Sequence, residues 1–453
     1  MPKKKIITTK EAKFKTSETK TRAVKRFFRL RGMKDILFDE YKYWDLVIKK
    51  ANELAKAYGF KSIKTPIMES AALYERSSGR TSDVVTKEMY SFIDKNGEKV
   101  ALRPEATPGL VRAYIEHGMF NLPLPVKMFW LGQIFRHDRP QAGRYRESYQ
   151  FDLEVFGEAS PVSDFLIILI AYNFFRELQV DVQIQINSIG CQECREEYII
   201  KLLDFYKERG KRSKLCSECR KRIIKNPLRL LDCKDEKCIS LREEAPQIVD
   251  FLCESCREHF IRVLEYLDEL DLPYNLNPYL VRGLDYYNRT VFEIWSADEA
   301  DAAKGQLALG GGGRYDSLVE LMGGRPTPAC GMAIGIERTI LKIKEKSIPL
   351  KKDQEKIIFI AQLGEQSRRK VIVLFEELRR SGFKVRQAFI KDSLKAQLEE
   401  ANRLGAKYSL ILGQKELMDG TILLRDMESG IQEIIDYKKI NLELEKRLNN
   451  GEK

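Results

Sequence analysis

Hydrophobic and polar residues alternate along residues 147–155, which is the pattern of a half-buried β-strand. The preceding residues are also strand-like, and the loop between the two arms contains Pro140 and Gly143, so residues 126–158 are predicted to form a hairpin. Side chains alternate between the two faces of a strand. One face of the second arm therefore has Ser148, Gln150, Asp152 and Glu154, and the other has Tyr149, Phe151, Leu153 and Val155.

Helical periodicity predicts helices over residues 39–58, 108–117, 163–178, 315–322 and 333–342. Ser163 is the expected N-cap of the third of these helices. Residues 280–295 have strand-like alternation, and residues 342–356 are lysine-rich and contain Pro349, as expected of a linker. The pattern then becomes α/β, with strands over 357–362 and 408–412, helices before Gly382 and over 393–404, and a hairpin over 421–437.

At 453 residues the chain is long enough for two or three domains. Residues 1–31 contain twelve Lys or Arg against two Glu, so they hold +10 of the net charge of +12. We expect this basic tail to be disordered, and its charge says little about the folded part. No apolar run reaches the roughly 20 residues of a membrane span, and no secretory signal is visible, so a cytoplasmic protein without membrane contact is expected.

The hairpin also contains four arginines, Arg136, Arg139, Arg144 and Arg146. Planar guanidinium groups bind phosphate oxygens bidentately, so these residues suit a polyphosphate, although a solvated hairpin with surface ion pairs has the same composition. Three further polar groups lie in apolar surroundings, namely Arg103/Glu105/Thr107, residues 280–287 and residues 335–338. The sequence contains no HExxH, G-x-S-x-G, Walker or G-x-G-x-x-G motif, which favours positioning and charge stabilisation at a phosphoryl centre.

Eight of the nine cysteines fall between residues 187 and 275, in four close pairs. Paired cysteines at this spacing in a reducing compartment are typical of zinc ligands, and eight thiolates suffice for two tetrahedral sites. The alternative is metal-free thiols that pack as small apolar groups. Cys330 stands alone and is expected in the core. The candidate ligands are Cys191, Cys194, Cys216, Cys219, Cys233, Cys238, Cys253 and Cys256.

These motifs together resemble the histidyl-tRNA synthetases, a family of class II aminoacyl-tRNA synthetases. Residues 65–69 resemble the class II motif 1, the hairpin resembles motif 2, and residues 310–314 with 335–338 resemble motif 3. The most specific likeness is LVRGLDYYNRTVFE at residues 280–293, which resembles the histidine-specific signature of the family. The cysteine-rich segment resembles the insertion domain of the bacterial members, which does not always contain cysteines.

The resemblance implies an α+β catalytic core on a mixed, mainly antiparallel sheet, a cysteine-rich and mainly helical insertion, and a C-terminal α/β anticodon-binding domain. The implied division is a tail over 1–28, a catalytic domain over 29–340 interrupted by the insertion over 187–275, a linker over 341–356 and the anticodon-binding domain over 357–453. It implies a homodimer that uses ATP with Mg²⁺ to attach L-histidine to tRNA(His) through histidyl-adenylate, with structural Zn²⁺ inferred from the cysteine spacing alone.

The resemblance also implies roles for individual residues. Arg136 and Arg282 are expected at the α-phosphate as catalytic arginines, and Arg144 and Arg338 at the outer phosphates, so Arg136, Arg144 and Arg338 form the ATP site. Arg338 counts among the catalytic arginines too. Residues expected to bind the histidine substrate are Glu105, Thr107, Gln150, Glu154, Arg282, Tyr286 and Tyr287, with Glu154 and Tyr287 at the imidazole nitrogens and Glu105 and Thr107 at the α-amino group.

Two positions depart from the family pattern. Ser148 stands where the family has an aromatic residue that stacks on adenine, so Tyr149 or another aromatic is needed there, or ATP binds more weakly. Ala106 replaces a glycine, which slightly restricts the backbone.

Two other functions remain as alternatives. A histidine-binding regulatory paralogue of ATP phosphoribosyltransferase would share the fold, but such proteins typically lack the C-terminal unit and parts of the motifs. A zinc-ribbon nucleic-acid-binding protein would explain the cysteines and the tail but leaves most of the chain without a role.

Overall fold

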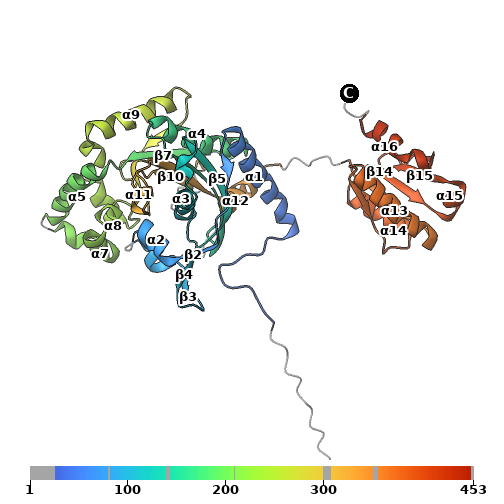
Figure 1. Ribbon diagram of the computed structural model, residues 1–453, viewed down its shortest axis with the longest axis horizontal. Helices are drawn as coiled ribbons and strands as arrows, with labels where there is room; N and C mark the ends of the chain where they lie inside the picture. Colours follow the sequence, from blue (N-terminus) through green and yellow to red (C-terminus); the bar gives the residue numbers. More distant parts are fainter. Residues whose placement is uncertain are drawn as a thin grey trace, which may run out of the picture. The chain divides into compact units, whose positions relative to one another are not determined.

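The computed structural model describes residues 26–79, 82–138, 143–208, 210–298, 308–349 and 356–449. The chain forms two compact units, Met1–Pro349 and Leu350–Lys453, each described here by itself (Figure 1). Nearly all of the predicted basic tail lies outside the described residues, as do Arg139, the hairpin loop residues 140–142 and part of the predicted linker.

The first unit is built on an eight-stranded sheet in the order β1-β5-β6-β11-β10-β9-β7-β8. Only the outer pairs β1–β5 and β7–β8 are parallel, so the sheet is mixed and mainly antiparallel, as predicted. The strands are β1 (Lys61–Ser62), β5 (Val126–Phe135), β6 (Glu147–Phe156), β7 (Val182–Ser188), β8 (Tyr274–Leu276), β9 (Asn288–Ser296), β10 (Ala308–Arg314) and β11 (Ala329–Gly335).

The helices α1 (Phe38–Ala57), α4 (Pro161–Glu177) and α12 (Ile336–Glu345) pack on one face of this sheet, where α9 (Glu254–Asp268) packs against α4 and β9 (Figure 1). The strand face that meets them contains Phe151, Leu153 and Val155, all at most 1% exposed. The alternation predicted for the hairpin is therefore confirmed, because these odd-numbered residues fill the core and the even-numbered ones face the other way.

Several predicted element boundaries were wrong. The N-cap of α4 is Ser160, whose side chain accepts a hydrogen bond from the Val162 backbone N–H, and not Ser163. Pro161 at the first helical position fixes this earlier start, because its ring presets a helical φ and its missing N–H needs no partner.

The other misplaced boundaries lie near the glycine-rich strands. Residues 333–335 belong to β11 because they pair with β6, and the helix begins only at Ile336. The predicted strand over 280–295 begins at Asn288, and the helix predicted over 315–322 is the single turn α11 (Leu318–Leu321).

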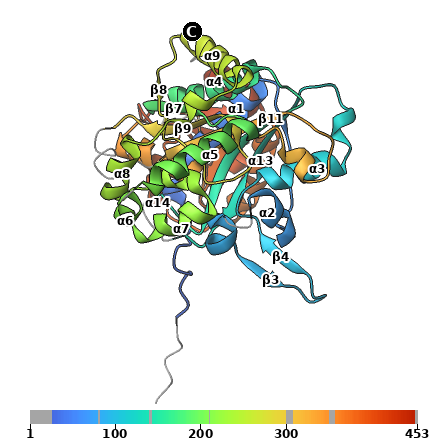
Figure 2. The ribbon, with the colours of Figure 1, turned by 90° about the vertical axis from the view of Figure 1, so that its left-hand side faces the viewer.

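A second, three-stranded sheet in the order β2-β4-β3 lies beside the main sheet. Figure 2 shows its β3–β4 end projecting from the unit. Its strands are β2 (Met68–Ser70), β3 (Ser91–Ile93) and β4 (Lys99–Leu102), and it leads into the helices α2 (Ala71–Ser77) and α3 (Thr107–Glu116).

The cysteine-rich segment is helical and lies between β7 and β8 in the chain. Its helices α5 to α8 group together in Figure 2 around a core that includes the buried rings of Tyr198 and Tyr206, whereas α9 lies beside α4. The helices are α5 (Gln192–Lys207), α6 (Lys211–Lys214), α7 (Ser217–Lys225), α8 (Glu236–Glu243) and α9 (Glu254–Asp268), with the 3-10 turns η3 (Pro227–Leu230) and η4 (Ile248–Phe251).

The second unit is an α/β domain on a five-stranded sheet in the order β13-β12-β14-β15-β16. The first three strands in that order are parallel and the last two pairs are antiparallel. Apolar clusters cover both faces of the sheet. The elements are β12 (Ile358–Gln362), α13 (Glu365–Arg380), β13 (Val385–Gln387), α14 (Leu394–Arg403), β14 (Tyr408–Leu412), α15 (Gln414–Asp419), β15 (Thr421–Asp426), β16 (Gln432–Asp436) and α16 (Ile440–Asn449). Within the described parts of both units, we find no helix with the length and apolar character of a membrane span.

Candidate active site

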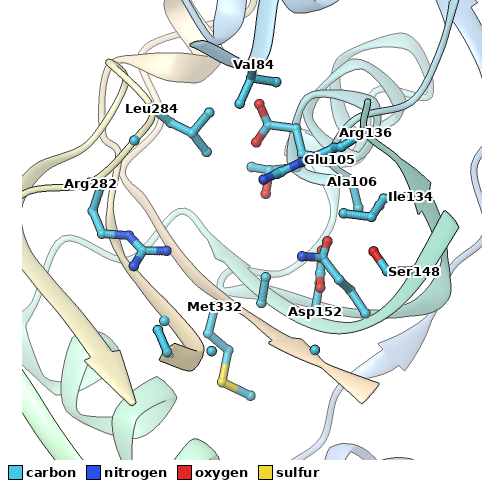
Figure 3. A pocket seen from close by; sticks show the side chains of 18 of the residues that line it. Val84, Glu105, Ala106, Ile134, Arg136, Ser148, Asp152, Arg282, Leu284 and Met332 are labelled. Carbon is cyan, nitrogen blue, oxygen red and sulfur yellow. The ribbon is translucent and has the colours of Figure 1, made fainter. Parts of the chain in front are cut away.

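The polar face of β6 forms the floor of a cavity of about 420 Å³. Ser148, Gln150, Asp152 and Glu154 all line it, together with residues of β10, β11 and the loop that precedes β9. Figure 3 shows the arrangement, with Arg282 on one side of the cavity and Ser148 and Ile134 on the other. All the residues that the sequence assigns to histidine or ATP binding line this cavity. They are Glu105, Thr107, Arg136, Arg144, Gln150, Glu154, Arg282, Tyr286, Tyr287 and Arg338.

Glu154 is buried at the base of the cavity and accepts hydrogen bonds from two hydroxyl groups. Thr107 Oγ1 donates to Glu154 Oε1 at 2.6 Å, and the Tyr315 hydroxyl donates to Oε2. Burial raises the pKa of Glu154 to about 8 even though both hydroxyls favour the ionised form. The opposite residue on β11 is Gly331, where a Cβ would lie 1.6 Å from Glu154 Oε2, so only glycine leaves room for this carboxylate.

Glu105 is the second buried carboxylate, and it too accepts from hydroxyl groups at both oxygens. Ser78 donates to Oε1, and the Tyr286 hydroxyl donates to Oε2 at 2.8 Å. Burial raises the pKa of Glu105, while Ser78, Arg136 and Tyr286 oppose that rise. Tyr286 therefore points into the site, as expected.

Three arginines gather at the rim where the hairpin loop meets α12. Arg136 Nε donates to the Pro104 carbonyl at 2.7 Å, and Arg144 Nη1 lies 3.1 Å from Asp138 Oδ2. Arg338 donates to the carbonyls of Ala308 and Gly143. Burial, together with the charges of Arg144 and Arg136, lowers the pKa of Arg338 to about 10. Such a concentration of like charge is costly without an anion, so this rim suits a polyphosphate.

Arg282 approaches the cavity from the loop before β9. Its Nη1 donates to Glu293 Oε1 at 2.7 Å. It passes close to the glycine-rich strand, because a Cβ at Gly311 would lie 2.6 Å from Arg282 Nη1. This close approach gives a specific reason for glycine at that position of β10.

Ser148 lines the cavity, whereas the ring of Tyr149 lies on the opposite face of β6. The Tyr149 ring packs edge-on against Trp44, with centroids 5.0 Å apart. Tyr149 therefore cannot replace the missing adenine-stacking aromatic.

Not every residue of the predicted polar groups serves the cavity. Arg103 donates to the carbonyls of Thr65, Pro66 and Gln133 and lies over the Trp130 ring, so it holds the segment that resembles motif 1. Conversely, sequence reasoning missed Ser78 and Tyr315, which have no local signal because they meet their carboxylates across 27 and 161 residues of chain.

The eight paired cysteines form two separate sets, Cys191/Cys194/Cys253/Cys256 and Cys216/Cys219/Cys233/Cys238. Within each set the sulfur atoms all lie within 4.8 Å of one another. A tetrahedral zinc with Zn–S distances of about 2.3 Å places its sulfurs roughly 3.8 Å apart. The Sγ atoms of Cys216 and Cys233 are 3.8 Å apart, and those of Cys191 and Cys194 are 3.5 Å apart.

Backbone N–H groups also point at these sulfurs. Cys253 N lies 3.1 Å from Cys194 Sγ, and Cys216 N lies 3.3 Å from Cys238 Sγ. Such donors favour thiolates, so the donor sets and their surroundings fit a metal ion. Cys330 is buried in β11 outside both sets, as predicted.

Comparison with known proteins is consistent with this geometry. Residues 32–339 match the family model described as histidyl-tRNA synthetase, and residues 349–447 match the anticodon binding domain. The histidine–tRNA ligase of Dehalococcoides mccartyi (strain ATCC BAA-2266 / KCTC 15142 / 195) is 45% identical over 92% of this chain and 99% of its own length. The histidine–tRNA ligase of Natranaerobius thermophilus is 42% identical over 89% of this chain and 94% of its own.

Solved structures also resemble this chain. The apo histidyl-tRNA synthetase of S. aureus superposes with a TM-score of 0.77 at 33% identity, covering 92% of this chain and 99% of that one. A protein described as an ATP phosphoribosyltransferase regulatory subunit/histidyl-tRNA synthetase from Bacillus halodurans C has a TM-score of 0.61 at 18% identity, covering 86% of this chain and 99% of that one, a likeness of fold alone. Because the family match spans most of the chain and the curated relatives align over nearly their whole length, the chain belongs to the histidyl-tRNA synthetase family.

Proposed function

We propose that the cavity on β6 activates L-histidine with ATP and that the product is transferred to tRNA(His). In the first step a carboxylate oxygen of histidine attacks the α-phosphate of ATP, which forms histidyl-adenylate and releases pyrophosphate. In the second step a terminal ribose hydroxyl of the tRNA attacks the acyl carbon and AMP leaves. The observation that supports this most is the meeting of an arginine rim and a buried carboxylate floor in one cavity.

The arginines act on the phosphates. Arg136 and Arg282 stabilise the charge that develops on the α-phosphate, and Arg144 and Arg338 hold the outer phosphates. Such fixed cations lower the barrier because they are oriented before the reaction begins. When bound with ATP, Mg²⁺ would supply charge neutralisation at the outer phosphates. The carboxylate of Asp138 lines the same cavity and is the kind of oxygen ligand that Mg²⁺ prefers.

The buried floor selects the amino acid. Glu154 and Tyr287 meet the two imidazole nitrogens, since a neutral ring has one donor and one acceptor. Glu105, Thr107 and Gln150 bind the α-amino group, with Tyr286 orienting Glu105 through its hydrogen bond. A site of this kind rejects apolar amino acids strongly, because its own buried polar groups would then be left unpaired.

Each cysteine set holds one structural Zn²⁺ as thiolates. The sulfur spacing and the backbone N–H donors described above support this assignment. The first set joins the start of α5 to the start of α9, so its ion closes the base of the insertion, while the second set lies within it. When bound, zinc supplies folding free energy to a small domain whose own core is limited.

We also propose the division into a tail over 1–28, a catalytic domain over 29–340 with its insertion over 187–275, a linker over 341–356 and an anticodon-binding domain over 357–453. The boundary of the two compact units after Pro349 supports the position of the linker.

The protein acts as a cytoplasmic homodimer in this proposal. Ile67 and Met68, in the segment that resembles motif 1, are 39% and 56% exposed, which suits a surface covered by a second copy.

Charging of tRNA tests the proposal against the regulatory alternative. Purified protein, ATP, Mg²⁺, labelled histidine and tRNA(His) transcript should yield acid-precipitable histidyl-tRNA. Arg282→Ala should abolish most of this product, and Arg262→Ala, on the exposed face of α9, should not. Histidine binding by wild-type protein without any charged tRNA would favour the regulatory paralogue.

A further inference from the structure

Three buried carboxyl groups face the cavity, and they differ in how they are satisfied. Glu105 and Glu154 each accept hydrogen bonds from hydroxyl groups at both oxygens. Asp152 lies between Gln150 and Glu154 on the same face of β6 and is 1% exposed. Its Oδ1 is buried, and no donor among the described residues forms a hydrogen bond with it. A buried carboxyl oxygen without a partner is costly, so this position calls for a donor from a ligand.

Nearby arginines do not fill this role. Arg103 donates to three backbone carbonyls and Arg136 Nε donates to Pro104, and neither forms a hydrogen bond with Asp152 among the described residues. The strand neighbours are Trp130 on β5, which donates nothing to Asp152, and Ala333 on β11, which has no donor in its side chain. Figure 3 shows Asp152 at the cavity floor, below Ala106 and beside Ser148.

The chemistry of the missing partner follows from the site. It must be small, because the group lies at the cavity floor, and cationic, because three carboxyl groups, those of Glu105, Asp152 and Glu154, face one cavity and a cation favours their ionised forms. Burial and the two glutamates raise the pKa of Asp152 well above its ordinary value, and a cation would favour its ionised form. An ammonium group meets these demands with three N–H donors.

We propose that Asp152 binds the α-ammonium group of the amino-acid substrate, together with Glu105. The assignment rests on the proposed function, since it takes histidine as the ligand. Residues two apart on a strand lie about 7 Å apart. With the imidazole at Glu154, the α-nitrogen of a histidine lying along β6 therefore comes over Asp152. Ammonium binding provides the donor that Oδ1 lacks and favours the ionised form of the carboxyl.

Three ligands separate this role from a merely structural one. Histidine and histidinol both have the amine, whereas imidazolepropionate has the ring and carboxylate but no amine. Affinities measured by calorimetry on full-length Asp152→Asn should fall about tenfold or more for the two amines, as expected for loss of a charged hydrogen bond, and stay within about twofold for imidazolepropionate. Asp45→Asn, on the exposed face of α1, is the matched control and should change none of them. Equal losses for all three ligands, or no loss for any, would overturn the assignment.

A second variant shows whether a loss of binding is caused by misfolding. Asp152→Ala removes the unpaired carboxyl without adding a polar group, so it should raise the melting temperature while weakening amine binding. A lower melting temperature together with unchanged histidine affinity would contradict the proposal. The proposed function is tested separately, by the affinity of wild-type protein for histidine and by ATP–pyrophosphate exchange. Exchange can fail while the amine selectivity of Asp152 is still observed.

Discussion

Arg282 and Glu293 form a 2.7 Å ion pair at the edge of the cavity. The second oxygen of Glu293 accepts a hydrogen bond from Trp295 Nε1 at 2.9 Å, so the carboxylate is fixed on β9 and the arginine is fixed by the carboxylate. The charge of Glu293 keeps the pKa of Arg282 raised although burial opposes it. Arg282 is thus oriented toward the place proposed for the α-phosphate before any substrate arrives.

Substitutions of Arg282 and Glu293 should lower the rate of adenylate formation to different extents. Arg282→Ala should lower histidine-dependent ATP–pyrophosphate exchange by about 10²–10³ in kcat, the cost of removing one preorganised donor to a developing charge. Glu293→Gln keeps the shape and a hydrogen-bond acceptor, so it should lower kcat less and leave the KM of histidine nearly unchanged. Arg262→Ala serves as control. Exchange that is unaffected in Arg282→Ala would remove the assigned role.

Ser148 offers a gain-of-affinity test. Stacking of a base on an aromatic side chain is worth about 1–3 kcal/mol, so Ser148→Phe should lower the KM of ATP roughly fivefold or more. The KM of histidine should stay the same, because Gln150 and Glu154 lie further along the strand. Ser148→Ala, which adds no ring, should match wild type. An unchanged ATP KM in Ser148→Phe would mean that adenine does not lie over this residue.

The raised pKa of Glu154 makes stability depend on pH. Its pKa is about 8 in the folded protein against 4.5 ordinarily, so between these values the folded chain holds a proton that the unfolded chain lacks. The free energy of unfolding of ligand-free protein should therefore fall as pH rises through this window, and Glu154→Gln should reduce that slope. Unfolding in denaturant at pH 5.5 and 8.5 measures this change in the free energy of unfolding. Parallel curves for wild type and Glu154→Gln would contradict the argument, and exposed Glu98→Gln should leave the slope unchanged.

The cysteine sets predict two zinc ions per chain, one for each set of four. Cys216→Ser should reduce the content to one by elemental analysis, and a chelator should lower the melting temperature of wild-type protein. Cys330→Ala should keep both ions, because Cys330 lies outside the sets. Wild-type protein free of zinc after growth in zinc-supplemented medium would argue for simple packed thiols.

The local pattern of residues predicts part of the fold and of the site, but not all of either. The two-residue period of β6 fixed which side chains face the cavity, because strand geometry depends on neighbours alone. Ala333–Gly335 was mistaken for helix, since this strand is held by its pairing with β6 and has little strand propensity of its own. The hydroxyl of Tyr315 meets Glu154 across 161 residues, a relation that no local pattern contains.

The cysteines illustrate the same limit. Their spacing predicted paired ligands, but the grouping depends on the fold, which brings Cys191 and Cys194 to Cys253 and Cys256 across the stretch of chain that contains the second set. Asp152 appeared in the sequence only as one more polar residue on a strand. Its significance depends on the absence of a partner for Oδ1, which requires the structure.

ATP–pyrophosphate exchange with each of the twenty amino acids in turn is the decisive measurement. Strong exchange is expected with L-histidine alone, because imidazole satisfies both the buried carboxylate and the phenol of the floor. This exchange should need no tRNA. Exchange with another amino acid, or none with histidine although histidine binds, would contradict the claim that this cavity forms histidyl-adenylate.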